Sequence, residues 1–550
     1  MSAALLLLVA VVVLAVAYVA YGGAVGRWLG VEPGRPTPAH RLQDGVDYVP
    51  AKRSVLVGHH FASIAGAAPI IGPVTALAFG WGPVFLWILV GGIFLGAVHD
   101  FSSLMASLRH DGKSIGEIIE ARLGYGGRTL FLLFSWTALI LVVAVFAIVV
   151  AKTFVQVPAA ATASVLFILL AVAFGAAVYR LRVPLPIATA VGVVALFSCI
   201  PLGLAFPLRL SFDAWLLVLM AYVFVASVTP VQVLLQPRDY LNSFLLYAML
   251  LLGFAGVVWA RPTLEAPAFT GWHVPELGSI FPVLFVTVAC GAISGFHSLV
   301  ASGTTAKQLD SEADAQAVGY GSMLVESLLA VLALVAVAYL SAGDYAAHMG
   351  EGGGGPVAAF SAGLGALIGT LGLPAAGATS FVALAVSAFA LTSLDTATRL
   401  SRFAFQEFFE PRRRSDDEKH VGALGMLARN RFLATACSVG AAGALAWSGS
   451  WKQIWPIFGS ANQLLAALAL LAVSVWLAHR GRRRLFVLIP MVIMYAVTAS
   501  SLGLLAWRHL VQDGGSVVLG SAAMALLVVA VVLAGLAARV TLRTRSGAPA

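Results

Sequence analysis

The sequence predicts an all-α polytopic membrane protein with about 15 transmembrane helices. Apolar residues make up 60% of the 550 residues, and charged residues make up only 10%. Soluble domains carry about 25% charged residues, so this chain has too little polar surface to be a water-soluble globule. The second observation is a series of apolar runs of about 20 residues, the length that crosses a bilayer as a helix. Disordered, fibrous and soluble classes are thereby excluded.

The apolar runs follow one another along the chain. The first is expected to remain as a helix and not to be cleaved as a signal peptide, because it has neither a basic start nor a small-residue cleavage motif before a soluble domain. In chain order the predicted spans are 3–22, 61–80, 83–108, 129–151, 160–179, 184–204, 213–234, 240–259, 281–301, 319–341, 376–403, 432–449, 454–478, 486–507 and 516–538.

Lysine and arginine predict the orientation of these spans. When the N-terminus is placed outside and the spans alternate, most of the 33 basic residues fall in cytoplasmic loops, with clusters at 412–431 and 480–484. This is the positive-inside pattern of membrane proteins, and it puts the C-terminus in the cytoplasm. The same pattern accounts for the net charge of +9. We therefore expect the lipid bilayer as a partner and no nucleic acid.

Two segments do not fit as simple spans. Residues 111–127 (DGKSIGEIIEARLGYGG) are short and amphipathic, and are predicted to lie at the inner surface. Residues 356–373 (PVAAFSAGLGALIGTLGL) are apolar but short and rich in glycine, which favours an outer re-entrant or surface hairpin. A sixteenth span is the alternative for the second segment, but it would reverse the following spans and spoil the charge pattern.

Two predicted spans contain residues that interrupt a helix. Residues 63–73 (SIAGAAPIIGP) hold two prolines and two glycines, and residues 290–298 read CGAISGFHS. A broken helix within lipid must face protein or a wet cavity. Close helix packing through small residues is the alternative explanation. If the breaks bind a substrate, the candidate residues are Gly66, Ala67, Ala68, Pro69, Gly72, Gly291, Ser294, Gly295, His297 and Ser298.

The directions of the two interrupted spans predict an inverted repeat. The charge pattern directs 61–80 from inside to outside and 281–301 from outside to inside. Interrupted helices in oppositely oriented halves are typical of transporters, in which freed NH groups suit a carboxylate and freed carbonyls suit a cation. The predicted parts are an N-terminal helix with its inner loop, a first half with extra helices, a second half, and C-terminal accessory helices with an inner tail, at 1–60, 61–260, 281–480 and 486–550.

Three acidic residues lie inside predicted spans, where charge is costly. Asp100, Glu326 and Asp395 are each placed about 10–12 Å from the inner end of their span, at 1.5 Å per residue, so they could face one inward cavity. Structural pairing is the alternative, and it is strongest for Asp395, because Arg399 follows at i+4. The candidate coupling residues are Asp100, Glu326, Asp395, Thr392 and Ser393, the two hydroxyl residues lying on a helix that could cross the first break.

Other polar residues give weaker signals. His297 lies just past the second break, where an imidazole would suit either proton coupling or simple packing. His59 and His60 are adjacent and have no metal-binding spacing, and the three cysteines lie in apolar runs without a CxxC motif. No P-loop, GxSxG or HExxH motif occurs. We therefore expect no enzyme, no metal and no cofactor beyond a coupling cation, either a proton or sodium.

Several blocks of the sequence resemble the carbon starvation protein (CstA) family. They include VDYVPAKRSVLVGHHFASIAGAAPIIGPV, QPRDYLNSFL, FPVLFVTVACGAISGFHSLVASGTT, VGYGSMLVESLLA, LTSLDTATRLSRF and WPIFGSANQLLAALAL, and the similarity runs from about residue 30 to 480. The chain is similar to the shorter members of the family. The resemblance implies a LeuT-type fold of the amino acid–polyamine–cation (APC) superfamily in the bacterial inner membrane. Six spans separate the breaks where a five-plus-five plan has four, so two helices would be insertions.

The resemblance and the broken helices together predict a secondary active transporter. The leading hypothesis is import of small peptides during carbon limitation, by alternating access coupled to a cation gradient, with a proton favoured. Pyruvate–proton symport is the alternative, because both substrates carry a carboxylate. The buried acids outnumber buried bases, which mildly favours a peptide with its ammonium group. A nutrient sensor is a more distant alternative, since no output domain is recognisable, and the oligomeric state is not indicated.

Overall fold

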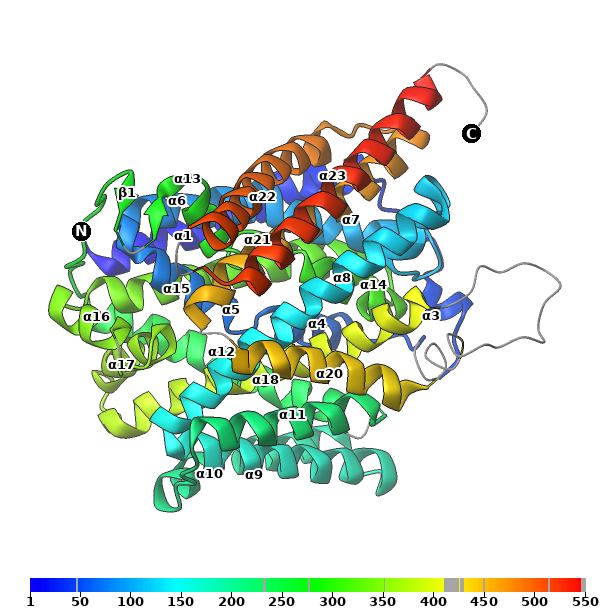
Figure 1. The fold of residues 1–550 in the computed structure, drawn as a ribbon. Coiled ribbons are helices and arrows are strands. Elements are labelled where there is room, and N and C mark those ends of the chain that lie inside the picture. Colours follow the sequence, from blue (N-terminus) through cyan, green and yellow to red (C-terminus); the bar gives the residue numbers. More distant parts are fainter. Residues whose placement is uncertain are drawn as a thin grey trace.

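The protein is a bundle of long helices that run between two ends (Figure 1). The computed structural model describes residues 1–45, 48–230, 234–275, 277–350, 352–409, 425, 430–448, 451–512 and 515–545. The N-terminus, the hairpin of β1 (His273–Val274) and β2 (Gly278–Ser279), and α16 (Ala342–Met349) lie at one end of the bundle. The short helix α3 (Pro38–Arg41) lies at the other end. The N-terminus, the hairpin and α16 are in segments predicted outside and α3 is in one predicted inside, and Figure 1 shows them at opposite ends.

The first half of the chain supplies the helices up to the long loop before β1. These helices follow the apolar runs of the sequence in chain order. Each run forms a helix because a helix satisfies its backbone hydrogen bonds internally, as lipid requires. They are α1 (Ala3–Ala17), η1 (Tyr18–Gly22), α2 (Gly23–Leu29), α4 (Arg53–Ile64), α5 (Ala68–Ala76), η2 (Leu77–Phe79), α6 (Trp81–Gly91), η3 (Gly92–Gly96), α7 (Ala97–Leu108), α8 (Ile115–Gln156), α9 (Pro158–Gly175), η4 (Ala176–Arg180), α10 (Leu185–Ala205), α11 (Phe212–Val228) and α12 (Leu235–Ala260).

The second half of the chain follows the hairpin and ends in a long apolar helix. Its elements are α13 (Ile280–Thr287), α14 (Phe296–Gly303), η5 (Thr305–Lys307), η6 (Glu312–Asp314), η7 (Gln316–Gly321), α15 (Ser322–Ala338), α17 (Pro356–Gly369), α18 (Ala375–Phe408), α20 (Arg431–Ser448), α21 (Trp451–His479), α22 (Leu485–Val511) and α23 (Val517–Arg545).

Every predicted span coincides with helix, although not all are full-length spans. In the described residues, 11 helices are long and apolar enough to cross a membrane, and the bent pair α4–α5 makes up to 12. The remaining three predicted spans are α11, which has only 17 residues, the interrupted pair α13–α14, and α20. All three pack against neighbouring helices: α11 and α20 contact each other and α18, while α13 contacts α21 and α22, and α14 contacts α7.

Residues 111–127 and 356–373, which do not fit as simple spans in the sequence, form short helical segments in the structure. In α8 the backbone turns at Gly124, whose φ of +75° suits glycine, so a short helix from Ile115 precedes the spanning part. The helix α17 has 14 residues, which is about 21 Å at 1.5 Å per residue and too short for a bilayer. It packs against α12, α15, α16 and α18 and is largely buried. Its length does not fit a sixteenth span.

A buried ion pair ties α12 to α18. Arg238 donates to the Asp395 carboxylate and, at 3.0 Å, to Asp239 Oδ1. Tyr222 of α11 also donates to Asp395 Oδ2 at 2.8 Å, and the Arg238 and Asp395 side chains are 1% and 0% exposed. Arg399 instead donates to the carbonyl oxygens of Ala226 and Thr229. The structure thus pairs Asp395 with an arginine, but the predicted partner, Arg399, is wrong. The tertiary contact with Arg238 takes the place of the i+4 contact within α18.

A double-mutant cycle distinguishes the two pairings. We expect Asp395→Asn and Arg238→Gln to couple by about 1–3 kcal/mol in the free energy of unfolding, because both groups belong to one buried network. The cycle of Asp395→Asn with Arg399→Gln should give a coupling below about 0.5 kcal/mol. Reversible unfolding of the detergent-solubilised variants measures both values. Equal coupling in the two cycles would contradict the assignment of Arg238 as the partner.

Candidate functional site

Both predicted helix breaks are present in the structure. The first separates α4 from α5 at residues 65–67, and the two helices bend by 48°. The second separates α13 from α14 at residues 288–295. Pro69 lies in the first turn of α5, where a missing NH is tolerated, so the proline starts a helix and does not continue α4. The breaks therefore follow from local sequence.

The two breaks lie against each other, although about 220 residues separate them in the chain. A Cβ on Gly72 would lie 2.6 Å from the Thr287 carbonyl oxygen at the end of α13. A Cβ on Gly291 would lie 3.9 Å from Pro69 Cα and 2.6 Å from Ala330 Cβ of α15. Glycine is needed at these places because the backbones approach closely. Most of the residues predicted to bind substrate are thus brought to one buried region, including Gly66, Ala67, Ala68, Ser294, Gly295 and Ser298.

The start of α14 is satisfied by a residue that sequence reasoning missed. Asn462 of α21 accepts from the Phe296 backbone NH at 2.9 Å, and its backbone carbonyl accepts from the Gly295 NH at 3.0 Å. Its amide nitrogen donates to Ser294 Oγ at 3.0 Å, while Ser298 Oγ donates to the Gly295 carbonyl at 2.7 Å. The signal in the sequence was the polar run Ser460–Gln463 inside an apolar span. In this conformation Asn462 caps the NH groups predicted to receive a carboxylate.

One of the predicted α18 hydroxyls, that of Ser393, lies at the first break. A Cβ on Gly66 would collide with Ser393 Oγ, and this hydroxyl is buried without a hydrogen-bond partner among the described residues. Thr392 Oγ1 accepts from Asn242 of α12 at 2.9 Å and donates to the Ala388 carbonyl at 3.1 Å. Thr392 is thereby occupied by its own helix and α12, whereas Ser393 is the hydroxyl that faces the break.

A buried cluster of charged side chains lies beside the second break. His297 Nδ1 lies 2.8 Å from Asp100 Oδ2, and His297 Nε2 lies 3.3 Å from Glu326 Oε2. His99 Nδ1 lies 2.7 Å from the other oxygen of Asp100. All four side chains are 0% exposed. One imidazole therefore lies between two carboxylates, Asp100 on α7 and Glu326 on α15. The charge of either carboxylate interacts electrostatically with the imidazole on α14.

Asp395 does not belong to this cluster. The hypothesis that all three buried acids face one cavity was wrong for Asp395, because its carboxylate is taken by Arg238 and Tyr222. Distance from the span end could not separate these environments, since it gives depth but not the direction in which a side chain points. His60 lies elsewhere again, with its Nδ1 atom 2.8 Å from Thr305 Oγ1 beyond the end of α14.

Two side chains of the cluster, together with Cys290, could also hold a metal ion. The Cys290 sulfur, a His297 ring nitrogen and a Glu326 carboxylate oxygen all lie within 4.8 Å of one another, and all three residues are buried. Asn462 Nδ2 lies 3.5 Å from the Cys290 sulfur. The sequence showed no metal-binding spacing here, because the three residues come from a break and two different helices.

A second polar network closes the predicted inner end of the bundle. Arg109 at the end of α7 forms a buried bidentate pair with Glu312, and Glu312 Oε2 also accepts from the Glu32 backbone NH at 2.9 Å. His40 Nε2 lies 2.8 Å from Asp310 Oδ1, and backbone bridges join Pro36 to Ser311 and Ala51 to Leu309. The segment after α2 is thereby fastened across the loop that follows α14.

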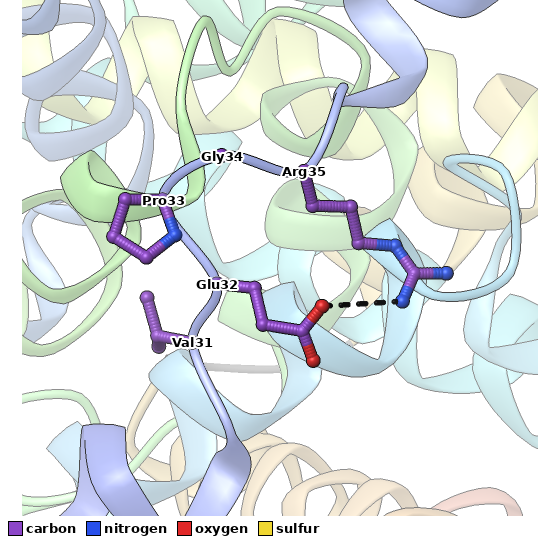
Figure 2. A pocket seen from close by; sticks show the side chains of 5 residues that line it. All are labelled: Val31, Glu32, Pro33, Gly34 and Arg35. Atoms are coloured by element: carbon purple, nitrogen blue, oxygen red, sulfur yellow. Dashed lines mark ion pairs between the residues drawn. The ribbon is translucent and has the colours of Figure 1, made fainter.

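A surface hollow of about 600 Å³ lies in the same loop and away from the breaks. Figure 2 shows that it is lined by five consecutive residues, Val31 to Arg35, with Glu32 and Arg35 paired at 3.8 Å. None of these residues lies at the breaks or in the charged cluster. The hollow therefore gives no information on a substrate site between the interrupted helices.

The comparison with solved structures shows a transporter fold. The chain is similar to a manganese transporter from Eremococcus coleocola solved in complex with an aromatic bis-isothiourea compound, with a TM-score of 0.53 and 11% identity over 92% of this chain and 99% of that one. At this identity the likeness shows the fold alone. The fold is all-α and polytopic, of the LeuT type predicted from the sequence.

The comparison with curated proteins gives closer relatives. The peptide transporter CstA of Campylobacter jejuni is 34% identical over 90% of this chain and 79% of its own length. The pyruvate/proton symporter BtsT of Escherichia coli is 32% identical over 86% of this chain and 77% of its own length. With the spanning helices, these relatives show a multi-pass bacterial membrane protein. The family model for carbon starvation protein CstA matches residues 2–353 and 349–501, and the chain belongs to this family.

Proposed function

We propose that this chain is a secondary active transporter that imports small peptides across the bacterial inner membrane by alternating access. The observation that carries the proposal is the meeting of two interrupted helices next to His297, which stands between two buried carboxylates. Interrupted helices near the bilayer midplane form the binding sites of inverted-repeat transporters. The relatives compared above are named as transporters, one of them for peptides and one for pyruvate with protons.

The substrate would bind between residues 65–73 and residues 290–298. Backbone groups at the two breaks, with Ser294, Ser298 and Ser393, would take the polar ends of the ligand. Asn462 now caps the start of α14, so a substrate carboxylate arriving there would replace the Asn462 amide oxygen. The backbone NH at the start of α14 would then have a hydrogen-bond acceptor both with and without substrate. Within lipid, backbone NH groups need such a partner.

The coupling cation is proposed to be a proton. Asp100 and Glu326 place two carboxylates around one imidazole with no exposed surface, so the cluster needs positive charge to balance it. Binding and release of a cation at this point would change the contact between α14 and the helices α7 and α15. The candidate coupling residues are then Asp100, His297 and Glu326, whereas Asp395 and Thr392 serve the contact between α12 and α18.

A peptide fits the charges of the site better than pyruvate does. The cluster beside the second break is acidic and would attract the ammonium group of a peptide. The buried Arg238, a candidate for binding a lone carboxylate, is already engaged by Asp395 and Asp239. Symport of pyruvate with protons is the second candidate, and it is favoured by the relative from Escherichia coli with that name.

The orientation is part of the proposal. Positive loops place the N-terminus outside and the C-terminus in the cytoplasm. In that orientation the Arg109–Glu312 pair and the segment after α2 lie at the cytoplasmic end. The structure would then represent a state closed towards the cytoplasm, and opening would require this buried pair to separate.

Uptake by the purified protein in liposomes tests the function directly. We expect a labelled dipeptide to accumulate under an inwardly directed proton gradient, and not under a sodium gradient, because the site offers carboxylates and an imidazole. Labelled pyruvate in parallel vesicles distinguishes the second candidate. Accumulation of neither substrate under either gradient would contradict the proposed transport, and accumulation under sodium alone would contradict the proton.

The role of the cluster is tested by removing one charge at a time. We expect Asp100→Asn and Glu326→Gln to lower gradient-driven uptake by more than about tenfold, because loss of one partner of a buried pair costs about 3–5 kcal/mol. Asp213→Asn in the first turn of α11 is the matched control, since this carboxylate is exposed and lies outside the cluster. Size-exclusion profiles confirm folding. Normal uptake by both cluster variants would remove these residues from the coupling mechanism.

A further inference from the structure

We propose that Cys290, His297 and Glu326 form a binding site for a divalent transition-metal ion of the zinc type, with Asp100 as the residue that positions His297. The three ligand atoms lie within 4.8 Å of one another in the buried core. The site would join the second break, α14 and α15 through one ion. It concerns a different ligand from the transported substrate, and only the expected effect of the metal on uptake rests on the transport mechanism proposed above.

The proposed ligand atoms of His297 and Glu326 are buried and lack hydrogen-bond partners in the part of the chain that the structure describes. Both carboxylate oxygens of Glu326 and the His297 Nε2 atom have none among the described residues, although Nε2 and Oε2 are only 3.3 Å apart. A buried polar atom without a partner is costly. When the imidazole carries its proton on Nδ1, the Nε2 lone pair faces a carboxylate oxygen, and a metal ion satisfies both atoms at once. The unpartnered buried atoms thus point to a ligand independently of the residue types.

The surroundings orient the proposed ligands. His297 Nδ1 lies 2.8 Å from Asp100 Oδ2, and in the neutral tautomer that donates this proton to Asp100 the Nε2 lone pair faces Glu326. A carboxylate behind a metal-binding histidine fixes the ring and its tautomer in many zinc sites. Asp100 is held in turn by His99 at 2.7 Å. The Asn462 amide donates towards the Cys290 sulfur at 3.5 Å.

The mixed donor set selects the class of ion. Sulfur and nitrogen ligands suit zinc and its neighbours, whereas sodium, magnesium and calcium take oxygen ligands. Three protein ligands leave a fourth position open, as in zinc sites with exchangeable water. Tetrahedral bonds of about 2.0–2.3 Å place ligand atoms roughly 3.3–3.8 Å apart. The atoms of this site would therefore move together by about 1 Å from their present separation of up to 4.8 Å.

Metal binding would fix parts that alternating access has to separate. Cys290 lies in the break itself, His297 is in the first turn of α14, and Glu326 is on α15. One ion coordinated by all three holds the break against α15. We therefore expect zinc to inhibit transport, and to do so through these residues and not through exposed histidines.

The first experiment measures binding without transport. Purified full-length protein is stripped with a chelator and titrated with Co²⁺, whose thiolate-to-metal absorption reports a sulfur ligand, and then with Zn²⁺ in competition. We expect one equivalent of Co²⁺ to bind with this absorption and to be displaced by Zn²⁺. Absence of stoichiometric binding, or binding without thiolate absorption, would overturn the proposal.

Matched variants separate this site from other cysteines and histidines. Cys290→Ser should abolish the thiolate absorption and weaken Zn²⁺ binding by at least about tenfold, and Asp100→Asn should weaken it about 10–100-fold through the orientation of His297. Cys199→Ser is the control, because this buried cysteine lies on α10 and its sulfur donates to the Ala195 carbonyl. Unchanged binding in Cys290→Ser, or equal loss in the control, would overturn the assignment.

A transport assay then tests the expected inhibition. Zn²⁺ is added to liposomes at increasing concentration, and uptake of each variant is expressed relative to its own uptake with chelator. We expect the inhibitory concentration to rise at least about tenfold in Cys290→Ser and to stay unchanged in Cys199→Ser, in line with the binding affinities. Inhibition that is equal in all variants would contradict the mechanism. Failure of uptake itself would bear on the proposed function and leave the binding result standing.

Discussion

The structure depends on the inability of lipid to satisfy a polar backbone. Two helices are interrupted at residues 65–67 and 288–295, and each interruption frees NH and carbonyl groups that need partners from protein. Asn462 supplies them at the start of α14 through its amide oxygen and its carbonyl. Small residues let the neighbouring backbones close over the breaks, as where Gly72 meets Thr287. The breaks are therefore possible only at the centre of the bundle.

The same constraint sorts the buried charges into two groups. Arg238, Asp395, Asp239 and Tyr222 join α11, α12 and α18 in a network in which one guanidinium, which stays charged, pairs with two carboxylates. The cluster around His297 also holds two carboxylates, but its base is an imidazole, and both oxygens of Glu326 are without hydrogen bonds among the described residues. A permanent cation stabilises one arrangement of helices, whereas an imidazole between two acids can gain or lose its charge. This difference separates a structural network from a candidate functional site.

Properties that depend on local sequence could be predicted, and those that depend on distant contacts could not. Apolar runs predicted the helices, and glycine and proline predicted both breaks, because these effects act within a few residues. The partner of Asp395 lies 157 residues away on α12, so the local i+4 rule selected Arg399 incorrectly. Asn462 and Cys290 were missed for the same reason, since their importance comes from contacts of the second break with α21 and with the acids.

The position of His297 links the two aspects of the site. It lies in the first turn of α14, directly after the break, so any movement of α14 carries the imidazole relative to Asp100 on α7 and Glu326 on α15. In the proposed mechanism, a small cation bound to this cluster is released when those helices separate, because Asp100 and Glu326 lie on different helices. An ion that also bonds Cys290 would hold the break and α15 together. The proposed coupling and the proposed metal inhibition thus use the same geometry, and they differ in whether the bound cation also coordinates the sulfur.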